Sequence, residues 1–321
     1  MGIEINALRA LGFAKRIKGA NFERTAMIGR QEIFFTEEDF AFIKKRVGLP
    51  LDYDRSIGIG QFAEALFKKF GARSVDAIDA SDYEGANVIT DLNKPIREEL
   101  RGRYTLCADF GSIEHIFNIP QVIDNIFALL VEGGTVIVQS QANGFAGHGF
   151  YQLSPELFYT AFSRENGFTD TTVFLVDMQD IRRWYFIRDP HALARRNDIA
   201  QRRSYYIFCI ARKRASVAGV QALQSDYQLA WTTEGHSHMG AFGRGLSSRV
   251  RHLFNPFLFQ NIRGLYYALR SLHDFRRETL RFDPDLISGE DFDRLVAAAA
   301  GGRSAGPAYN RAVTAPIAQV D

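Results

Sequence analysis

Short apolar runs alternate with helix-like stretches from about residue 24 to residue 214. The runs are rich in β-branched and aromatic residues, whereas the stretches between them place apolar residues three or four positions apart, as in Phe62, Leu66 and Phe70. This alternation is typical of an α/β domain in which helices cover both faces of a mostly parallel sheet. Strands are predicted over 25–31, 74–78, 86–90, 104–108, 135–139, 172–176 and 204–211.

Helix starts are marked by capping residues. Thr36 precedes three acids and Ser154 precedes Pro155, and both arrangements are typical of a helix N-terminus. Helices are accordingly predicted from 37 to about 47, over 61–70, from about 120 to 131 and from 155 onward.

The composition changes near residue 215, where the β-rich pattern stops. We therefore expect four parts, the last of them rich in Ala, Gly and Pro. They are an N-terminal helical segment (1–23), the α/β domain (24–214), a helical C-terminal unit (215–296) and a mobile tail (297–321).

The C-terminal unit contains an amphipathic helix that starts near Pro256. Its apolar residues recur at spacings of four and three, which predicts one buried stripe packed on the α/β domain or on a second subunit. The alternative is a peripheral membrane contact through the basic stretch near 249–281, because eight arginines lie between Arg244 and Arg281 inclusive. The stripe consists of Leu258, Ile262, Leu265, Leu269 and Leu272.

Composition excludes several classes of protein. With 46% hydrophobic and 24% charged residues the chain is typical of a globular protein, and a net charge of +2 does not indicate a nucleic-acid partner. Its two cysteines, Cys107 and Cys209, lie in apolar runs, so neither a disulfide framework nor a thiolate zinc site is expected. His236 and His238 lack an obvious third ligand, so no metal site is predicted. No stretch approaches the ~18 apolar residues of a membrane helix, and a cytoplasmic location is expected.

Acidic residues follow several predicted strands at their carboxyl ends. Asp79 follows the second strand, Asp91 the third and Asp109 the fourth, and open parallel sheets bind ligands at this edge. A carboxylate after the second strand can accept hydrogen bonds from a ribose diol, and one after the third can accept a bond from an adenine amino group. The pattern favours an adenosyl ligand. The alternative for Asp79 and Asp91 is that each caps its own turn.

Four segments follow the strands in a characteristic order. They are Asp-Ala-Ser-Asp-Tyr-Glu-Gly (79–85), Thr-Asp-Leu-Asn (90–93), Asp-Phe-Gly-Ser-Ile-Glu-His-Ile-Phe (109–117) and Leu-Leu-Val-Glu-Gly-Gly-Thr-Val (129–136). With them, the region 24–214 resembles the class I S-adenosylmethionine-dependent methyltransferases. The resemblance implies a doubly wound, mostly parallel, seven-stranded Rossmann-like sheet whose last strand (204–211) is antiparallel, with S-adenosylmethionine as cofactor. It further implies that Asp79 and Ala80 bind the ribose, that Asp91 and Leu92 meet the adenine, and that the segment holding Asp109, Gly111 and His115 closes over the methionine end.

The glycine-rich loop departs from the family pattern. The family has an acid-x-Gly-x-Gly-x-Gly loop directly after its first strand, whereas this chain has Gly29, Arg30 and Gln31 there, with Gly58 and Gly60 about thirty residues later. We interpret the residues between as an insertion, so that both parts approach the cofactor, where glycine lets backbone amides come close. The alternative is a nicotinamide dinucleotide fingerprint built on Gly58 and Gly60, although no strand is predicted before it.

Methyl transfer requires alignment, exclusion of water and, for an acceptor that carries a proton, a base. The candidate bases are His148, in the loop after the fifth strand, and the pair Glu114 and His115, with Tyr151 as a hydrogen-bonding partner. The alternatives are that His148 is a turn histidine and that Glu114 and His115 merely begin a helix.

The sequence therefore predicts methyl transfer from S-adenosylmethionine to a small-molecule or glycan-linked acceptor. Two alternatives stay open. One is a non-catalytic binding or scaffold protein that retains this fold, and the other is a nicotinamide-dependent oxidoreductase that uses Gly58 and Gly60.

Overall fold

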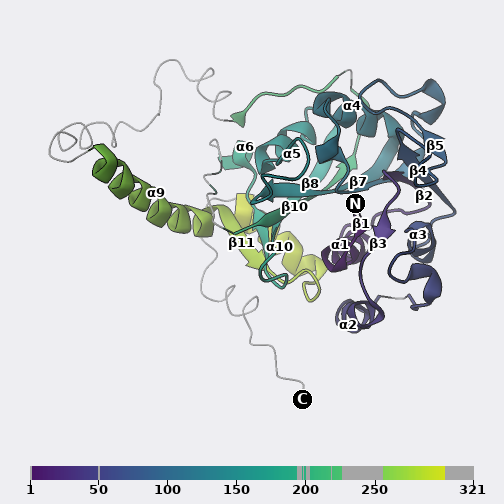
Figure 1. Ribbon diagram of the computed structural model, residues 1–321, viewed down its shortest axis with the longest axis horizontal. Coiled ribbons are helices and arrows are strands. Elements are labelled where there is room, and N and C mark those ends of the chain that lie inside the picture. Colours follow the sequence, from purple (N-terminus) through teal and green to yellow (C-terminus); the bar gives the residue numbers. More distant parts are fainter. Residues whose placement is uncertain are drawn as a thin grey trace.

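A nine-stranded sheet forms the centre of the computed structural model, which describes residues 2–49, 51–193, 197, 199, 203–217, 219–225 and 256–300. The strand order is β11-β9-β8-β10-β7-β6-β2-β4-β5, and Figure 1 shows β11 toward the left of the sheet and β5 at the right. The strands are β2 (Arg24–Ile28), β4 (Ser74–Asp79), β5 (Val88–Ile89), β6 (Tyr104–Phe110), β7 (Leu130–Asn143), β8 (Phe168–Asp177), β9 (Trp184–Ile187), β10 (Tyr205–Lys213) and β11 (Thr279–Phe282).

Strand β10 runs antiparallel to both of its neighbours, β7 and β8, whereas β5, β4, β2, β6 and β7 are mutually parallel. The order reverses at β2, because β4 and β5 lie on one side of it and β6 and β7 on the other, as in doubly wound folds. The α/β Rossmann-like class and the antiparallel last strand are therefore confirmed.

The predicted strand number is corrected from seven to nine. Strands β9 and β11 pair with each other and extend the sheet beyond β8. Each has only four residues, and β11 follows a long helix directly, so neither produced a run with its own periodicity.

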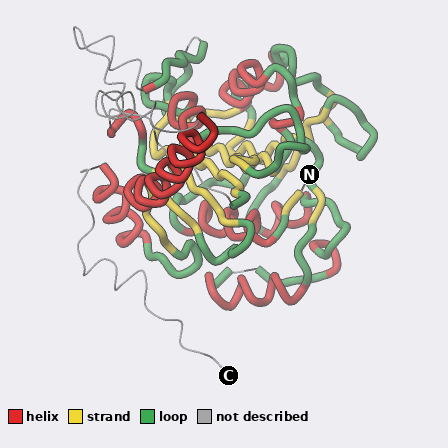
Figure 2. Tube along the Cα trace, turned by 60° about the vertical axis from the view of Figure 1, so that its left-hand side comes forward, coloured by secondary structure: helices red, strands yellow, loops and turns green. Residues whose placement is uncertain are grey.

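Helices cover both faces of the sheet (Figure 2). The helices α4 (Ile119–Leu129) and α5 (Pro155–Ala161) pack on one face. The helices α1 (Ile5–Arg16), α2 (Glu37–Val47), α3 (Glu64–Lys69) and α10 (Gly289–Ala300) contribute to the core of the other face. The shorter elements are β1 (Gly2–Ile3), β3 (Glu32–Ile33), α6 (Pro190–Leu193) and the 3₁₀ turns η1 (Arg55–Ile57), η2 (Glu98–Leu100) and η3 (Ile113–His115).

The predicted helix caps are present. The Thr36 hydroxyl accepts a hydrogen bond from the Asp39 amide at 3.2 Å, and the Asp39 carboxylate accepts one from the Thr36 amide at 2.9 Å. Ser154 likewise accepts a bond from the Leu157 amide at 3.4 Å. These contacts satisfy amides that have no partner within the first turn of a helix.

Several boundaries differ from the prediction, among them the starts of α3 and β7. Helix α3 begins at Glu64 rather than at residue 61, because the Gln61 carbonyl accepts a hydrogen bond from the Ile33 amide at 2.8 Å outside the helix. Strand β7 begins at Leu130, so Gly133 and the glycine after it lie within the strand, where its pairing with β6 shifts in register.

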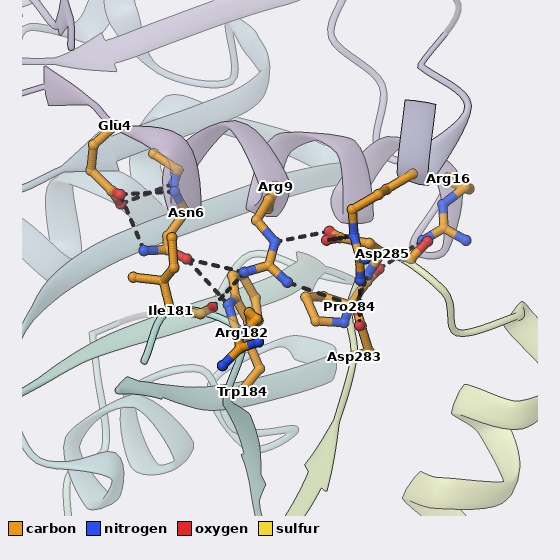
Figure 3. A network of polar contacts seen from close by, with 12 residues as sticks. Glu4, Asn6, Arg9, Arg16, Ile181, Arg182, Trp184, Asp283, Pro284 and Asp285 are labelled. Atoms are coloured by element: carbon orange, nitrogen blue, oxygen red, sulfur yellow. Dashed lines mark hydrogen bonds and ion pairs between the residues drawn. The ribbon is translucent and has the colours of Figure 1, made fainter. Parts of the chain in front are cut away.

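The C-terminal segment completes the sheet and the core. Phe292 of α10 packs edge-on against Phe13 of α1, with ring centroids 5.1 Å apart. A polar network around Arg9 joins α1 to the turn that follows β11 (Figure 3). Residues 279–300, which the sequence placed mainly in a helical unit, thus belong to the α/β body. Residues 297–300 end α10, and the rest of the predicted tail lies outside the described residues.

The long helix α9 (Pro256–Glu278) extends away from the sheet (Figure 1). Leu265, Leu269 and Leu272 are 61%, 61% and 55% exposed, so at these residues the stripe does not pack on the α/β domain, and packing on a second subunit stays a prediction. Leucine spacing specifies an apolar helix face but not what covers it. The side chains of Leu258 and Ile262 lie outside the described residues. Among the helices described, none is both long enough and apolar enough to span a bilayer.

Candidate active site

The two halves of the split glycine loop lie side by side at the carboxyl end of β2. The Ala63 amide donates to the Gln31 carbonyl at 2.9 Å, and the Gly60 amide donates to the Ile33 carbonyl at 2.9 Å. Between them the chain forms β3, α2 and η1, the segment that we interpret from the sequence as an insertion. Gly29 has a φ of +69°, a conformation that favours glycine, and its amide donates to the Ile78 carbonyl of β4 at 2.8 Å.

Gly58 follows the 3₁₀ turn η1 and not a strand. A dinucleotide fingerprint requires its first glycine to end a strand and its last to open a helix. The local structure around Gly58 and Gly60 therefore does not match that fingerprint.

Several buried polar atoms at the carboxyl edge of the sheet have no partner within the described residues. The Gln31 side chain donates to the Ile28 carbonyl at 2.5 Å and to Ser112 Oγ at 3.1 Å, which leaves its Oε1 unpaired. Asp109 accepts a bond from the Ser112 amide at 3.0 Å through Oδ1, while Oδ2 is buried and unpaired. Burial, and then the charge of Glu114, raises the pKa of Asp109 well above its usual range. Unpaired buried acceptors of this kind fit the polar groups of a bound ligand.

The two acids predicted to bind the adenosine differ in their surroundings. Asp79 ends β4, and its Oδ1 accepts a single long hydrogen bond, from the Ser81 amide at 3.3 Å. Asp91 is engaged in its own turn, because its Oδ1 accepts bonds from the amide and the side chain of Asn93, both at 3.0 Å, and its Oδ2 pairs with Lys94 at 3.1 Å. Asn93 and then Lys94 lower the pKa of Asp91. The contacts therefore support the turn-cap alternative directly at Asp91, whereas at Asp79 only one weak contact supports it. Of their neighbours, Ala80 is exposed and Leu92 is buried.

Arg30 reaches from the end of β2 to the loop after β4. Its Nε lies 2.7 Å from Glu64 Oε1, its Nη1 donates to the Glu84 carbonyl at 2.6 Å, and its guanidinium lies 3.9 Å from the centre of the Phe62 ring. Gly85 leaves room for it, since a Cβ there would lie 2.6 Å from Nη1. Arg30 thus ties α3 to the loop that begins with Asp79, a contact that the sequence did not predict.

The candidate bases come together from two elements. Gly111 directly follows β6 and has a φ of +95°. The turn η3, which carries Glu114 and His115, begins two residues later. His115 Nε2 lies 3.2 Å from His148 Nε2 in the loop after β7. Glu114 is buried and accepts a hydrogen bond from Ser140 Oγ at 3.0 Å. Burial lowers the pKa of His115, and the neighbouring His148 lowers it further.

Two hydrogen bonds and the close approach of a glycine hold the His148 loop against η3 and the residues just after it. The Phe150 amide donates to the Glu114 carbonyl at 2.8 Å, and the Tyr151 hydroxyl donates to the Phe117 carbonyl at 2.6 Å. Gly149 has a φ of +68°, and a Cβ there would lie 2.9 Å from the Glu114 carbonyl oxygen. Tyr151, predicted as a hydrogen-bonding partner at the site, donates its hydroxyl proton to the Phe117 carbonyl and so helps to anchor this loop.

Sequence reasoning missed Ser112, Gln139 and Ser140. Ser112 and Ser140 hold Asp109 and Glu114, and Gln139 has a buried, unpaired Oε1. A signal existed for Gln139 and Ser140, because they are polar residues at the carboxyl end of an otherwise apolar strand. The contacts of Ser112 depend on the turn geometry and left no such signal.

A separate hollow of about 700 Å³ lies at the opposite edge of the sheet. It is lined by residues of α5 and of the amino end of β8, including Tyr159, Phe162 and Phe168. None of the predicted site residues borders it. It is therefore distinct from the edge where the candidate residues gather.

Comparison with known proteins gives similarity only at the level of solved structures. No family model and no curated protein matches the chain. The chain is similar to a Haemonchus contortus phosphoethanolamine N-methyltransferase in complex with S-adenosyl-L-methionine, at 13% identity over 65% of this chain and 53% of that one, with a TM-score of 0.37. It is similar to a Burkholderia thailandensis 1,6-didemethyltoxoflavin-N1-methyltransferase, at 16% identity over 65% and 79%, with a TM-score of 0.34. It is also similar to a Bacillus halodurans protein proposed to be a methyltransferase, at 12% identity over 63% and 99%, with a TM-score of 0.36.

Proposed function

We propose that this protein transfers a methyl group from S-adenosylmethionine to a small-molecule acceptor. The observation that carries the proposal is the insertion of antiparallel β10 between β7 and β8 in a doubly wound sheet. Sheets of nicotinamide-dependent dehydrogenases lack such a strand, whereas the class I methyltransferases that the sequence resembles have one. The order of strands reverses at β2, which is where doubly wound sheets bind their ligands.

The residues at this edge fit the cofactor. Asp79 has carboxylate capacity to spare for ribose hydroxyls, since only one long hydrogen bond engages it. Within the described residues, Gln31 Oε1 is a buried acceptor without a partner, to which an amino group can donate, and Asp109 Oδ2 is a buried carboxyl oxygen without a partner. Gly29 and Gly60 keep the surrounding backbone free of side chains. When bound, the cofactor supplies a methyl group on a sulfonium, which leaves the chain the tasks of orientation and proton removal.

The acceptor belongs beside the two histidines. His148 is exposed and held by a loop that three contacts fix, so it can take a proton from an acceptor hydroxyl or amine. Phe117 and Phe150 lie next to it, 69% and 64% exposed, with ring centroids 5.6 Å apart. This aromatic surface suits an acceptor with an apolar ring face, including a sugar of a glycan-linked substrate.

The non-catalytic alternative has one observation in its favour. Arg30 bridges α3 and the Glu84 carbonyl of the loop after β4, and this loop lies at the edge that the cofactor would approach. A protein that had given up catalysis could retain such a bridge permanently. In an active enzyme, Arg30 would instead hold the Asp79 loop in place around the cofactor.

Calorimetric titration of the full chain tests the proposal. We expect one equivalent of S-adenosylmethionine and of its demethylated product to bind, and no binding of either nicotinamide cofactor. Labelled methyl transfer to a panel of small hydroxyl and amine acceptors then distinguishes an enzyme from a scaffold. Absence of binding to both sulfur compounds would refute the proposed function.

A further inference from the structure

We propose that Glu114, His115 and His148 bind one divalent transition-metal ion of the zinc class. Each residue offers one ligand atom, and these atoms all lie within 4.8 Å of one another. Among the described residues, this is the group of three or more His, Cys, Asp or Glu side chains that is arranged to hold an ion. The sequence predicted no metal site, because it could consider only histidines close together along the chain.

The separation of the two imidazole nitrogens matches a shared ion. Zn–N bonds of 2.0–2.1 Å at a tetrahedral angle place two ligand nitrogens about 3.3 Å apart. His115 Nε2 and His148 Nε2 are 3.2 Å apart, with the ring planes inclined at 60°. The separation of the two nitrogens is therefore compatible with a shared ion, and Glu114 offers a carboxylate oxygen within 4.8 Å of both.

The arrangement is fixed by contacts beyond the three side chains. His148 is held near His115 because the Phe150 amide donates to the Glu114 carbonyl at 2.8 Å and because Gly149 packs directly on Glu114. Ser140 Oγ donates to Glu114 Oε2 at 3.0 Å, which orients the carboxylate. Hydrogen bonds to a ligating carboxylate are typical of metal sites, where they set ligand orientation.

The donor set indicates the class of ion. Two imidazoles and one carboxylate suit Zn²⁺ and its first-row neighbours, whereas Mg²⁺ and Ca²⁺ prefer oxygen ligands. Three protein ligands leave at least one position open, as in catalytic rather than structural sites. His115 and His148 are exposed, so a water molecule or an oxygen of a bound acceptor can reach that position. The metal site does not depend on the proposed methyl transfer, and His148 would not serve as the proposed base while its Nε2 binds an ion.

The competing explanation is a direct hydrogen bond between two neutral imidazoles, in which one ring donates to the other. Such a bond needs no ion. On this explanation, Co²⁺ would not bind stoichiometrically to the cluster.

Metal titration of the full chain, stripped with a chelator, separates these explanations. Co²⁺ should bind with one equivalent and produce the visible absorption of a cobalt site, and Zn²⁺ should displace it, while Mg²⁺ should not. Loss of an outer partner alone weakens metal binding about 10–100-fold, so His115→Ala and His148→Ala should each weaken Co²⁺ binding at least about 100-fold. Glu114→Gln should have a similar effect.

Two controls test whether the effect belongs to this cluster. His191→Ala removes a histidine that pairs with Asp189 elsewhere, and a His236→Ala/His238→Ala double variant removes the histidine pair of the polar stretch. Both should bind Co²⁺ as the wild type does. Lack of stoichiometric Co²⁺ binding by the wild type, or binding that survives both His115→Ala and His148→Ala, would overturn the proposal. The metal titrations contain neither S-adenosylmethionine nor an acceptor, so a failure of metal binding is distinguishable from a failure of the proposed function.

Discussion

The Arg9 guanidinium and the Asp285 carboxylate form a buried ion pair between residues 276 positions apart, with Nε 2.9 Å from Oδ1. Arg46 contacts the other carboxylate oxygen of Asp285 at 3.1 Å. Arg16 donates to the backbone carbonyls of the same turn, at 2.7 Å from Pro284 and 3.2 Å from Asp285 (Figure 3). The network joins the first helix of the chain to the segment that follows its last strand.

Asp285→Ala should destabilise the fold strongly. Arg9 would remain buried without its closest carboxylate partner, and removal of one member of a buried pair costs about 3–5 kcal/mol. Urea unfolding measures the loss. Glu290→Ala, which removes an exposed acid of the same segment, should change the free energy of unfolding by less than about 0.5 kcal/mol. Equal effects of the two changes would contradict a stabilising role for the network.

Asp79→Ala should weaken binding of S-adenosylmethionine. A hydrogen bond to a charged group contributes about 1.5–3 kcal/mol, so the dissociation constant should rise about 10–150-fold. Asp82, exposed on the same loop, provides the control, and Asp82→Ala should leave the affinity unchanged. Calorimetry compares the two variants. If Asp79→Ala binds the cofactor as tightly as the wild type, the ribose assignment fails.

His148→Ala should reduce turnover with little change in cofactor affinity. Loss of a positioned base typically lowers the rate about 10²–10⁴-fold, and His148 lies on the acceptor side of the site. Labelled methyl transfer to an accepted substrate measures the rate, and calorimetry measures the affinity. His191→Ala, remote from η3, should retain the wild-type rate. A large change in cofactor affinity with an unchanged rate would place His148 elsewhere in the mechanism.

Gly149→Ala should disturb the His148 loop, whereas Gly147→Ala should not. A Cβ on residue 149 would lie 2.9 Å from the Glu114 carbonyl oxygen at a φ of +68°, while a Cβ on residue 147 would meet nothing within 4 Å. Backbone strain of this kind costs about 1–3 kcal/mol. Thermal unfolding and Co²⁺ titration should both show the difference. Identical behaviour of the two variants would mean that the loop does not depend on this contact.

Truncation of two residues of α9 to alanine should change stability by very different amounts. Leu269 is 61% exposed and Phe275 is 8% exposed. Leu269→Ala should therefore change stability by less than about 0.5 kcal/mol, and Phe275→Ala should cost about 3–5 kcal/mol. Chemical denaturation provides the comparison. A large loss for Leu269→Ala would indicate that another surface covers the stripe in solution, and co-sedimentation with anionic vesicles would test the membrane alternative.

Local sequence signals determined the elements of the domain and their order along the chain. Alternation of apolar runs with helical stretches, together with caps such as Thr36 and Ser154, depends on neighbours a few residues apart, and this is information that a sequence displays directly. The acids at the strand ends were visible for the same reason, because the carboxyl ends of parallel strands share one edge.

Tertiary structure alone decided which distant residues meet. The pairing of β9 with β11, the ion pair of Arg9 with Asp285 and the approach of His115 to His148 each join segments whose separation along the chain carries no periodic signal. The exposure of Leu269 is of the same kind, since its spacing records an apolar helix face but not the presence of a partner. Contacts of this sort follow from how the complete chain packs, so the sequence indicated the edge where chemistry could occur and the fold selected the side chains that gather there.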